Sequence, residues 1–195
     1  MNFLAHLYLS GANENVMIGN FIGDFVKGKA FENYEDEIRM GILLHREIDS
    51  FTDSHEIVRE SKKRLQPKYR HYSPVIADVF YDHFLSANWD MYSEIPLLEY
   101  TEAFYKLTDN YSSTLPQAAQ NTLKYMSAGN WLYNYQHIEG IHQALSGMSR
   151  RTKFDSKMEL ASLDLKTDYE DYKAEFVAFF PELVIHSKQF LIGLA

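Results

Sequence analysis

Apolar residues recur at intervals of three and four positions along most of this chain, as they do on one face of an amphipathic helix. The first long stretch with this spacing contains Ile18, Phe21, Ile22, Phe25 and Val26. Gly28 is placed to end that helix, because glycine commonly follows the last helical residue. The alternation of Val, Ile and Thr that is typical of strands does not interrupt the pattern.

The same spacing predicts a series of further helices. The expected ranges are 35–52, 56–65, 75–89, 97–108, 116–128, 131–145 and 164–180, with a last helix after Pro181. Pro67 is expected to break the helix that begins at residue 56, whereas Ser73 and Pro74 fit the start of the next one. Because the 195 residues contain neither an internal repeat nor a linker, we expect residues 1–195 to form one compact all-α domain of seven to nine helices.

Composition and charge narrow the class of protein. The chain has 19 Lys+Arg against 27 Asp+Glu, and the net charge of −8 argues against a nucleic-acid-binding protein. It contains no cysteine, which excludes disulfide scaffolds, Cys-ligated metal centres and thiol catalysis. We see neither a secretory signal nor an apolar run of about 20 residues. The expectation is a soluble cytoplasmic protein with no membrane contact.

Polar side chains occur in the segment 35–52 where a helix should be apolar. His45 and Asp49 share one face with Ile38 and Ile42, and the opposite side of this helix is apolar as well. An imidazole and a carboxylate one turn apart point the same way, as two ligands of a divalent cation would. The alternative is structural, with His45 donating to a backbone carbonyl and Asp49 pairing with an arginine.

The segment 75–89 contains a second group of polar residues. His83 lies within an apolar stripe, and Asp78 and Asp82 lie one turn apart on a neighbouring face. Burying two facing carboxylates is very costly unless a positive charge compensates them. Arg or Lys side chains from elsewhere would compensate the charge. A bound cation would do so too and would also explain His83.

Two more apolar segments carry a titratable residue, since Asp24 borders the first apolar stripe and His6 is embedded near the N-terminus. A single histidine in such a place is usually a core residue, but four such segments favour a metal centre. Nitrogen and oxygen ligands without sulfur are typical of catalytic Mn, Fe, Mg or Zn sites that hydrolyse phosphoesters. Arg46 and Lys27, close to proposed ligands in the sequence, are candidate phosphate contacts or ordinary solvent-facing charges.

Four blocks of the sequence are similar to those of a known family. They are MNFLAHL at the start of the chain, GNFIGDFVKG at 19–28, HREIDSFTD at 45–53 and DVFYDHFL at 78–85. These blocks resemble acyl carrier protein phosphodiesterases, which are regarded as a divergent branch of the HD-type phosphohydrolases. The resemblance implies an HD-domain-like helical fold and hydrolysis of 4′-phosphopantetheine from holo acyl carrier protein. It also implies a divalent cation, usually Mn²⁺, with Mg²⁺ or Fe²⁺ as alternatives.

The resemblance assigns roles to the residues already singled out. The expected metal ligands are His6, Asp24, His45, Asp82 and His83. Asp49 is either a further ligand or the group that orients or deprotonates the attacking water, and Asp78 is either catalytic or a support that holds a ligand in place. The wider superfamily has an adjacent His-Asp pair, whereas this chain has Asp82 and His83 in the reverse order.

Basic residues gather in two places. The first cluster lies between residues 59 and 71, and the second consists of Arg150, Arg151 and Lys153. Because acyl carrier proteins are small and acidic, we expect Lys62, Lys63 and Arg64 of the first cluster to dock the carrier, although such a run is commonly a solvated helix face.

Two alternative functions stay open at this point. One is a phosphohydrolase that acts on a nucleotide or another small phosphoester. The other is a non-catalytic helical binding module, in which the buried acids and histidines merely pair with arginines.

Overall fold

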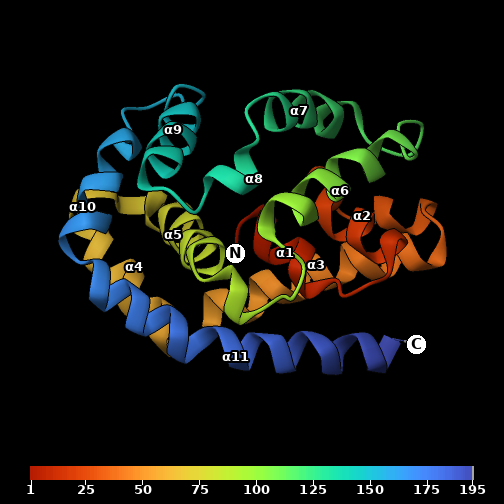
Figure 1. Cartoon of the computed structure of the whole chain (residues 1–195), viewed down its shortest axis with the longest axis horizontal. Coiled ribbons are helices and arrows are strands. Elements are labelled where there is room, and N and C mark those ends of the chain that lie inside the picture. The colour runs from red at the N-terminus through yellow and green to blue at the C-terminus, as the bar shows by residue number, and fades with distance from the viewer. Residues whose placement is uncertain (195) are drawn as a thin grey trace.

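The computed structural model describes residues 1–194, and the regular elements in that range are all helical (Figure 1). The α-helices are α1 (Phe3–Leu9), α2 (Glu14–Ile22), α3 (Asp36–Ser54), α4 (Glu56–Tyr69), α5 (Ser73–Ala87), α6 (Leu97–Asp109), α7 (Gln117–Ala128), α8 (Trp131–Asn134), α9 (Ile138–Ser149), α10 (Ala161–Thr167) and α11 (Tyr169–Leu194). Short 3-10 helices, η1 (Gly23–Phe25), η2 (Ala30–Asn33), η3 (Arg70–Tyr72), η4 (Trp89–Met91) and η5 (Met158–Leu160), join some of them. The predicted all-α class is confirmed, and the HD-like arrangement stays a prediction.

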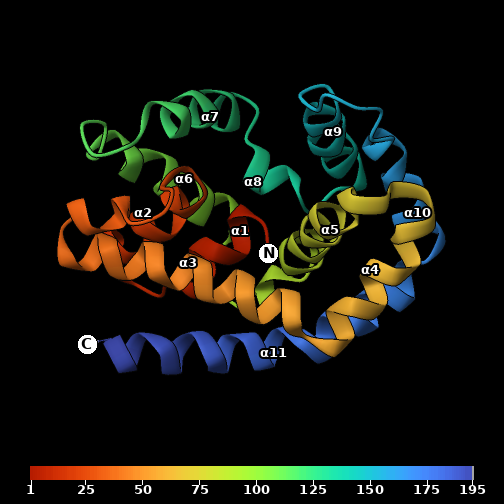
Figure 2. The ribbon, with the colours of Figure 1, turned by 180° about the vertical axis from the view of Figure 1, so that it is seen from behind.

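Helix α1 lies in the middle of the molecule, where it packs against α2, α5 and α11 (Figures 1 and 2). Its residues Leu4, Ala5 and Leu7 are completely buried. Helix α11 runs along one side of the domain for 26 residues, a length of about 39 Å. This arrangement surrounds the short first helix, and with it His6, by longer helices.

Helices α2 and α3 cross at two glycines. A Cβ atom on Gly19 would lie 2.0 Å from the backbone oxygen of Ile38, and a Cβ atom on Gly41 would collide with the backbone of α2. Gly23, just after α2, leaves room for a side chain, because its Cβ would lie 2.2 Å from Cγ of His45. The absence of a side chain at Gly19 and Gly41 thus lets the two helix backbones approach closely.

The ends of several helices differ from the prediction. Helix α2 stops at Ile22, because the chain tightens into η1, and Gly28 instead occupies a turn with φ of +57°. The predicted helix 131–145 is divided into α8 and α9, since the backbone of His137 is extended. Helix α1 was not predicted, and the predicted helix 164–180 is divided between α10 and α11, so residues 1–194 contain more α-helices than the seven to nine predicted.

Proline does not end helices where the sequence suggested it. Helix α4 continues through Pro67 to Tyr69, and α11 continues through Pro181. Each proline removes one backbone hydrogen bond, and packing of the surrounding turns offsets that loss. In α11 the buried side chains Phe179, Phe180 and Leu183 flank the proline on both sides.

Helix α11 is also long and apolar enough to cross a membrane by length and composition, with a mean hydropathy of 1.2 in its most apolar window. One such helix is weak evidence, because core helices pass the same test. The side chains of Phe176, Phe179 and Phe180 in α11 lie in the core. Of the most apolar window of this helix, 22% is buried inside the domain.

Candidate metal centre

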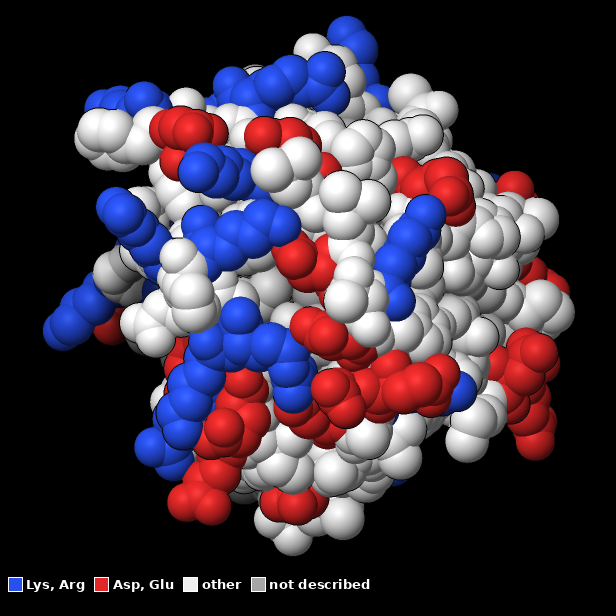
Figure 3. Space-filling view, turned by 90° about the vertical axis from the view of Figure 1, so that its left-hand side faces the viewer, with Lys and Arg blue, Asp and Glu red and all other residues white. Residues whose placement is uncertain are grey.

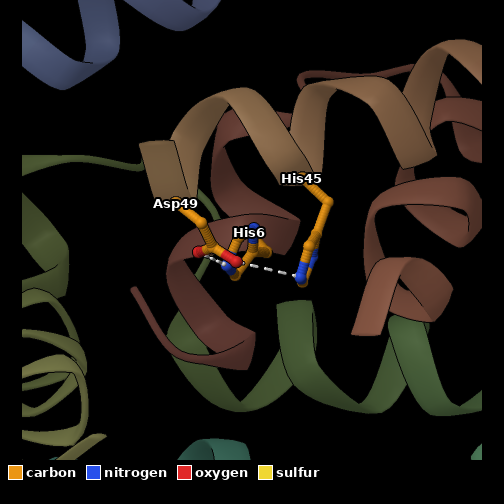
Figure 4. A group of neighbouring side chains, drawn as sticks. All are labelled: His6, His45 and Asp49. Atoms are coloured by element: carbon orange, nitrogen blue, oxygen red, sulfur yellow. Dashed lines mark ion pairs between the residues drawn. The ribbon is translucent and has the colours of Figure 1, made fainter. Parts of the chain in front are cut away.

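Three side chains from α1 and α3 point toward one another (Figure 4). His45 and Asp49 leave the same face of α3, as their spacing predicted, and His6 faces them from α1. The Nε2 atom of His6 lies 3.2 Å from Oδ1 of Asp49, and Nε2 of His45 lies 3.3 Å from Oδ2 of the same residue. One potential ligand atom from each residue lies within 4.8 Å of the others.

A fourth side chain reaches this group from η1. Oδ1 of Asp24 lies 3.5 Å from Nε2 of His45, and the Asp24 side chain is 63% exposed. Ligands of an octahedral cation bound at roughly 2.1 Å are about 3 Å apart, which is close to the spacing of these oxygen and nitrogen atoms. The ligand atoms of His6, His45 and Asp49 all lie within 4.8 Å of one another and fit a small divalent ion, whereas Asp24 is outside that set and borders it at the edge of the solvent.

Asn20 of α2 sets the orientation of the His6 ring. The Nδ2 atom of Asn20 donates to the backbone oxygen of His6 at 2.7 Å and to Oγ of Ser10 at 2.9 Å. Since a carbonyl oxygen can only accept, the amide orientation is fixed, and Oδ1 of Asn20 faces Nδ1 of His6 at 2.8 Å. His6 must therefore donate from Nδ1, and in the neutral ring the lone pair on Nε2 faces two acceptors, Oδ1 of Asp49 and the backbone oxygen of Met1, at 3.2 Å each.

The backbone of Asn20 fixes the second ring in the same way. Nδ1 of His45 lies 2.8 Å from the backbone oxygen of Asn20, so this nitrogen carries the proton. The two imidazoles are stacked with ring centroids 4.0 Å apart. The buried Nε2 atom of His45 has no aligned hydrogen-bond partner anywhere in residues 1–194, although two carboxylates lie near it. Lone pairs of both rings consequently converge on Asp49.

Charges in this cluster shift one another's pKa values. Burial opposes a charge on His45, but the carboxylates of Asp24 and Asp49 raise its pKa to about 9. Burial and the charge of His45 lower the pKa of His6 to about 4. Burial opposes the charge on Asp49, yet its pKa falls far below its usual value, because the proton on His45 and the charge of the Met1 amine stabilise the carboxylate. Without a metal ion, the carboxylates are compensated by one proton on His45. A divalent cation can replace that proton.

Asp78 is compensated by the amino group of Met1. The nitrogen lies 3.1 Å from Oδ1 of Asp78 and 3.6 Å from Oδ1 of Asp49. Burial alone would lower the pKa of this amine, but the surrounding carboxylates raise it. Burial also raises the pKa of Asp78, against the attraction of the amine. The positive charge that the sequence required near Asp78 is thus the amine of the first residue, and Asp78 contacts the cluster only through it.

Asp82 faces the beginning of α1 rather than the cluster. Its carboxylate accepts hydrogen bonds from the backbone N–H groups of Leu4 at 2.7 Å and of Asn2 and Ala5 at 3.3 Å each. A carboxylate at this position caps the helix and interacts favourably with its dipole. Burial nevertheless raises the pKa of Asp82 to about 7. Asp82 therefore holds the helix that carries His6 and offers no free oxygen to an ion.

His83 lies in another part of the core. Its Nδ1 atom is 2.8 Å from the backbone oxygen of Tyr135, and its Nε2 atom is 3.2 Å from the hydroxyl of Tyr169. Both ring nitrogens are engaged, as in an ordinary buried histidine. The structure does not bring His83, expected as a ligand, to the other ligand candidates.

The two expected phosphate contacts lie near the cluster without facing it. Arg46 donates to the backbone oxygens of Val26 and Gly28 and lies over the ring of Phe31. It thereby fixes the loop that follows Asp24. Lys27 is exposed in that loop.

The residues expected to dock the carrier already have partners within the chain. Nζ of Lys62 lies 2.6 Å from Oδ1 of Asp53. Nζ of Lys63 lies 2.6 Å from Oε1 of Glu60. Arg64 pairs with Glu175 at 2.7 Å and stacks over Tyr172. Their charge is partly neutralised on their own surface, and their role in docking stays a prediction.

A cavity of about 370 Å³ opens beside the cluster. Asp24, Asp49 and Asp78 line it together with Trp131, Met148 and Arg151. One part of the wall is therefore acidic, another is apolar, and a single arginine faces the same space. A cavity of this volume fits a small organic ligand.

Sequence reasoning missed Asn20 and the Met1 amine, and it noted Arg151 only as a member of the second basic cluster. Asn20 gave one usable signal, because an amide within a strongly apolar helix must find buried hydrogen-bond partners. The contacts of the other two depend on how distant segments pack, and no spacing in the sequence shows that.

Comparisons with known proteins point to one family. A family model described as acyl carrier protein phosphodiesterase matches residues 1–183. Proteins of that name from Enterobacter sp. (strain 638) and Klebsiella pneumoniae (strain 342) are each 34% identical to this chain, over 190 and 186 residues. The matches cover 96% and 94% of this chain and 98% and 96% of the relatives. No solved structure matches the chain.

Proposed function

The chain belongs to the acyl carrier protein phosphodiesterase family, as its sequence blocks predicted, and we propose that it releases 4′-phosphopantetheine from holo acyl carrier protein. Family membership makes the chain a phosphoric diester hydrolase. In the proposed reaction, water is added across the bond between phosphorus and the serine oxygen of the carrier. The products are apo carrier and free phosphopantetheine.

One observation carries the proposal of a metal-dependent reaction. The Nε2 atoms of His6 and His45 converge on the carboxylate of Asp49, because Asn20 engages the Nδ1 atom of each ring. Groups that all accept hydrogen bonds repel one another unless a proton or a cation lies between them. The set of two imidazoles and carboxylates suits Mn²⁺, with Mg²⁺ or Fe²⁺ as alternatives.

Each residue then has a defined task. His6, His45 and Asp49 hold the ion, and Asp24 completes the set from the exposed side. When bound, such a cation supplies a Lewis acid that activates water and neutralises charge on the phosphate oxygens. The second oxygen of Asp49 orients the attacking water, while Asp78 and the Met1 amine hold Asp49 in place.

The cavity supports a substrate with an anionic head and a long arm. Arg151 can pair with a phosphate oxygen, and the apolar wall with Trp131 and Met148 can cover the arm and exclude water. A reaction on holo carrier belongs to fatty acid and lipid metabolism, and we expect it in the cytoplasm.

The test is mass spectrometry of holo carrier incubated with the chelator-treated protein and Mn²⁺. We expect the carrier to lose the mass of its prosthetic group, and we expect no loss with chelator or with His45→Gln. His83→Gln is the matched control, because this buried histidine lies away from the cluster, and it should keep the activity. Turnover of nucleotides without any change in the carrier would favour a small-molecule phosphohydrolase. A protein that binds no cation would favour a binding module.

A further inference from the structure

We propose that Arg150, Arg151 and Lys153, which follow α9, form the surface on which a small acidic carrier protein docks. We call this group the α9 basic surface. The inference rests on the proposed function, because it identifies where the protein part of that substrate is held.

The chemistry of the substrate limits where docking can occur. The bond to be broken joins the phosphate directly to a serine on the carrier, so the carrier's own surface must come to the mouth of the cavity. Arg151 lines this cavity together with Asp24 and Asp49, whereas no residue of α4 does. The α9 basic surface is therefore continuous with the site of reaction.

The cations of the α9 basic surface are free to bind a partner. The side chains of Arg150 and Arg151 contact only backbone oxygens of the preceding turn, those of Ser146 and Gly147, at 3.2 Å each. Within residues 1–194 no carboxylate lies within ion-pair distance of Arg150, Arg151 or Lys153. By contrast, Lys62, Lys63 and Arg64 each have an acidic partner, which an approaching carrier would have to displace.

The distribution of charge on the molecular surface agrees with this difference. Figure 3 views the side of the molecule that carries α4 and α10. Lys and Arg predominate near the top of this face, whereas blue and red side chains lie against one another in its lower half. Between residues 150 and 157 the only acidic residue is Asp155, against four basic ones. An acidic protein would meet an unbalanced positive field there.

An exposed aromatic side chain lies within the same segment. Phe154 is 74% exposed, although it is a large apolar residue. Exposed aromatic groups among arginines are typical centres of protein interfaces, because they bury a large apolar area on binding. Phe154 is therefore the expected apolar contact, and Arg150 and Lys153 supply the charges beside it.

The experiment compares two double charge reversals. Arg150→Glu with Lys153→Glu changes the α9 basic surface without altering a residue that lines the cavity. The matched control is Arg59→Glu with Lys63→Glu on α4, which reverses the same number of charges at side chains that are 54% and 66% exposed. It includes Lys63, one of the residues that the sequence suggested for docking.

Two substrates are measured with each variant, holo carrier and the small phosphodiester bis(p-nitrophenyl) phosphate, both with Mn²⁺. We expect the first variant to lower kcat/KM for holo carrier about tenfold or more at low salt, and less at high salt. Its turnover of the small phosphodiester should stay within about twofold of wild type. The α4 control should change neither substrate by more than about twofold.

The outcomes separate this inference from the proposed function. A loss of carrier turnover in the α4 control alone would place docking on α4. If neither variant lost carrier turnover, or if the first variant lost turnover of both substrates equally, the docking inference would also be wrong. The proposed function of the wild-type protein would still stand in both cases. Wild-type protein that cleaves neither substrate would refute the proposed function itself, and this inference with it.

Discussion

Replacing Asn20 by alanine tests whether this residue presents both histidines to a cation. The completely buried side chain makes three hydrogen bonds, two to His6 and one to Ser10, of 2.7–2.9 Å. Alanine would remove all three hydrogen bonds and leave Nδ1 of His6 unpaired, while Oγ of Ser10 still donates to the backbone oxygen of His6 at 2.8 Å. At about 1 kcal/mol or more for each, the folded state should lose roughly 3 kcal/mol, which a domain of this size can tolerate.

The effect on metal binding follows from the His6 ring. Without the acceptor at Nδ1, His6 is free to turn or to carry its proton on Nε2, where the ion should bind. Residues that support a metal ligand in this way typically change the affinity by about 10- to 100-fold. We therefore expect Asn20→Ala to weaken Mn²⁺ binding by about that factor.

Asn20→Asp is the control, because it keeps the oxygen that faces His6 Nδ1, although it replaces the two donated hydrogen bonds by a buried carboxylate oxygen facing the His6 carbonyl. Both variants should lose stability in urea unfolding. In titration calorimetry, however, only the alanine variant should lose affinity for Mn²⁺. Long-range ¹⁵N–¹H NMR should show the Nδ1–H form of His6 in wild type and in the aspartate variant. A folded alanine variant with wild-type affinity would refute this reasoning.

Other predictions concern His45 and a glycine near it. In metal-free protein the pKa of His45 in the folded state, about 9, lies above its usual value of 6.5. Protonation of His45 therefore stabilises the folded state fully below about pH 6.5, and this contribution disappears by about pH 9. The pKa difference of about 2.5 corresponds to a free energy on the order of 3 kcal/mol. In urea unfolding, wild type should therefore be much more stable than His45→Gln at pH 6 and little more stable at pH 9.5. An advantage that does not change with pH would contradict this. Gly23→Ala should weaken Mn²⁺ binding in calorimetry, because the new Cβ would lie 2.2 Å from the His45 ring. Gly147→Ala in α9 should leave the affinity unchanged, since nothing lies within 4 Å of that position. Equal affinities in the two glycine variants would show that space beside His45 is unimportant.

The sequence predicted the helical fold and part of the candidate site. The spacing of apolar residues is a local property, so it predicted most of the helices, and the spacing of His45 and Asp49 placed them on one face of α3. Neither result depends on knowing how distant segments pack.

What failed was the assignment of partners across the fold. Asp82 and His83 are adjacent, so their side chains point about 100° apart on α5 and meet different neighbours. One caps α1 and the other contacts Tyr135. The sequence required positive charge near Asp78, yet it could not show that the Met1 amine lies 3.1 Å away. Such contacts are decided by the packing of helices that are remote in the chain.

Pulsed EPR of Mn²⁺ added to the chelator-treated protein tests the central claim most directly, because it detects nitrogen atoms bound to the ion. The account predicts the signal of two imidazole nitrogens in wild type, one in His45→Gln and one in His6→Gln. His83→Gln should keep both. A spectrum without imidazole nitrogen, or one that changes only when His83 is replaced, would contradict the proposed centre.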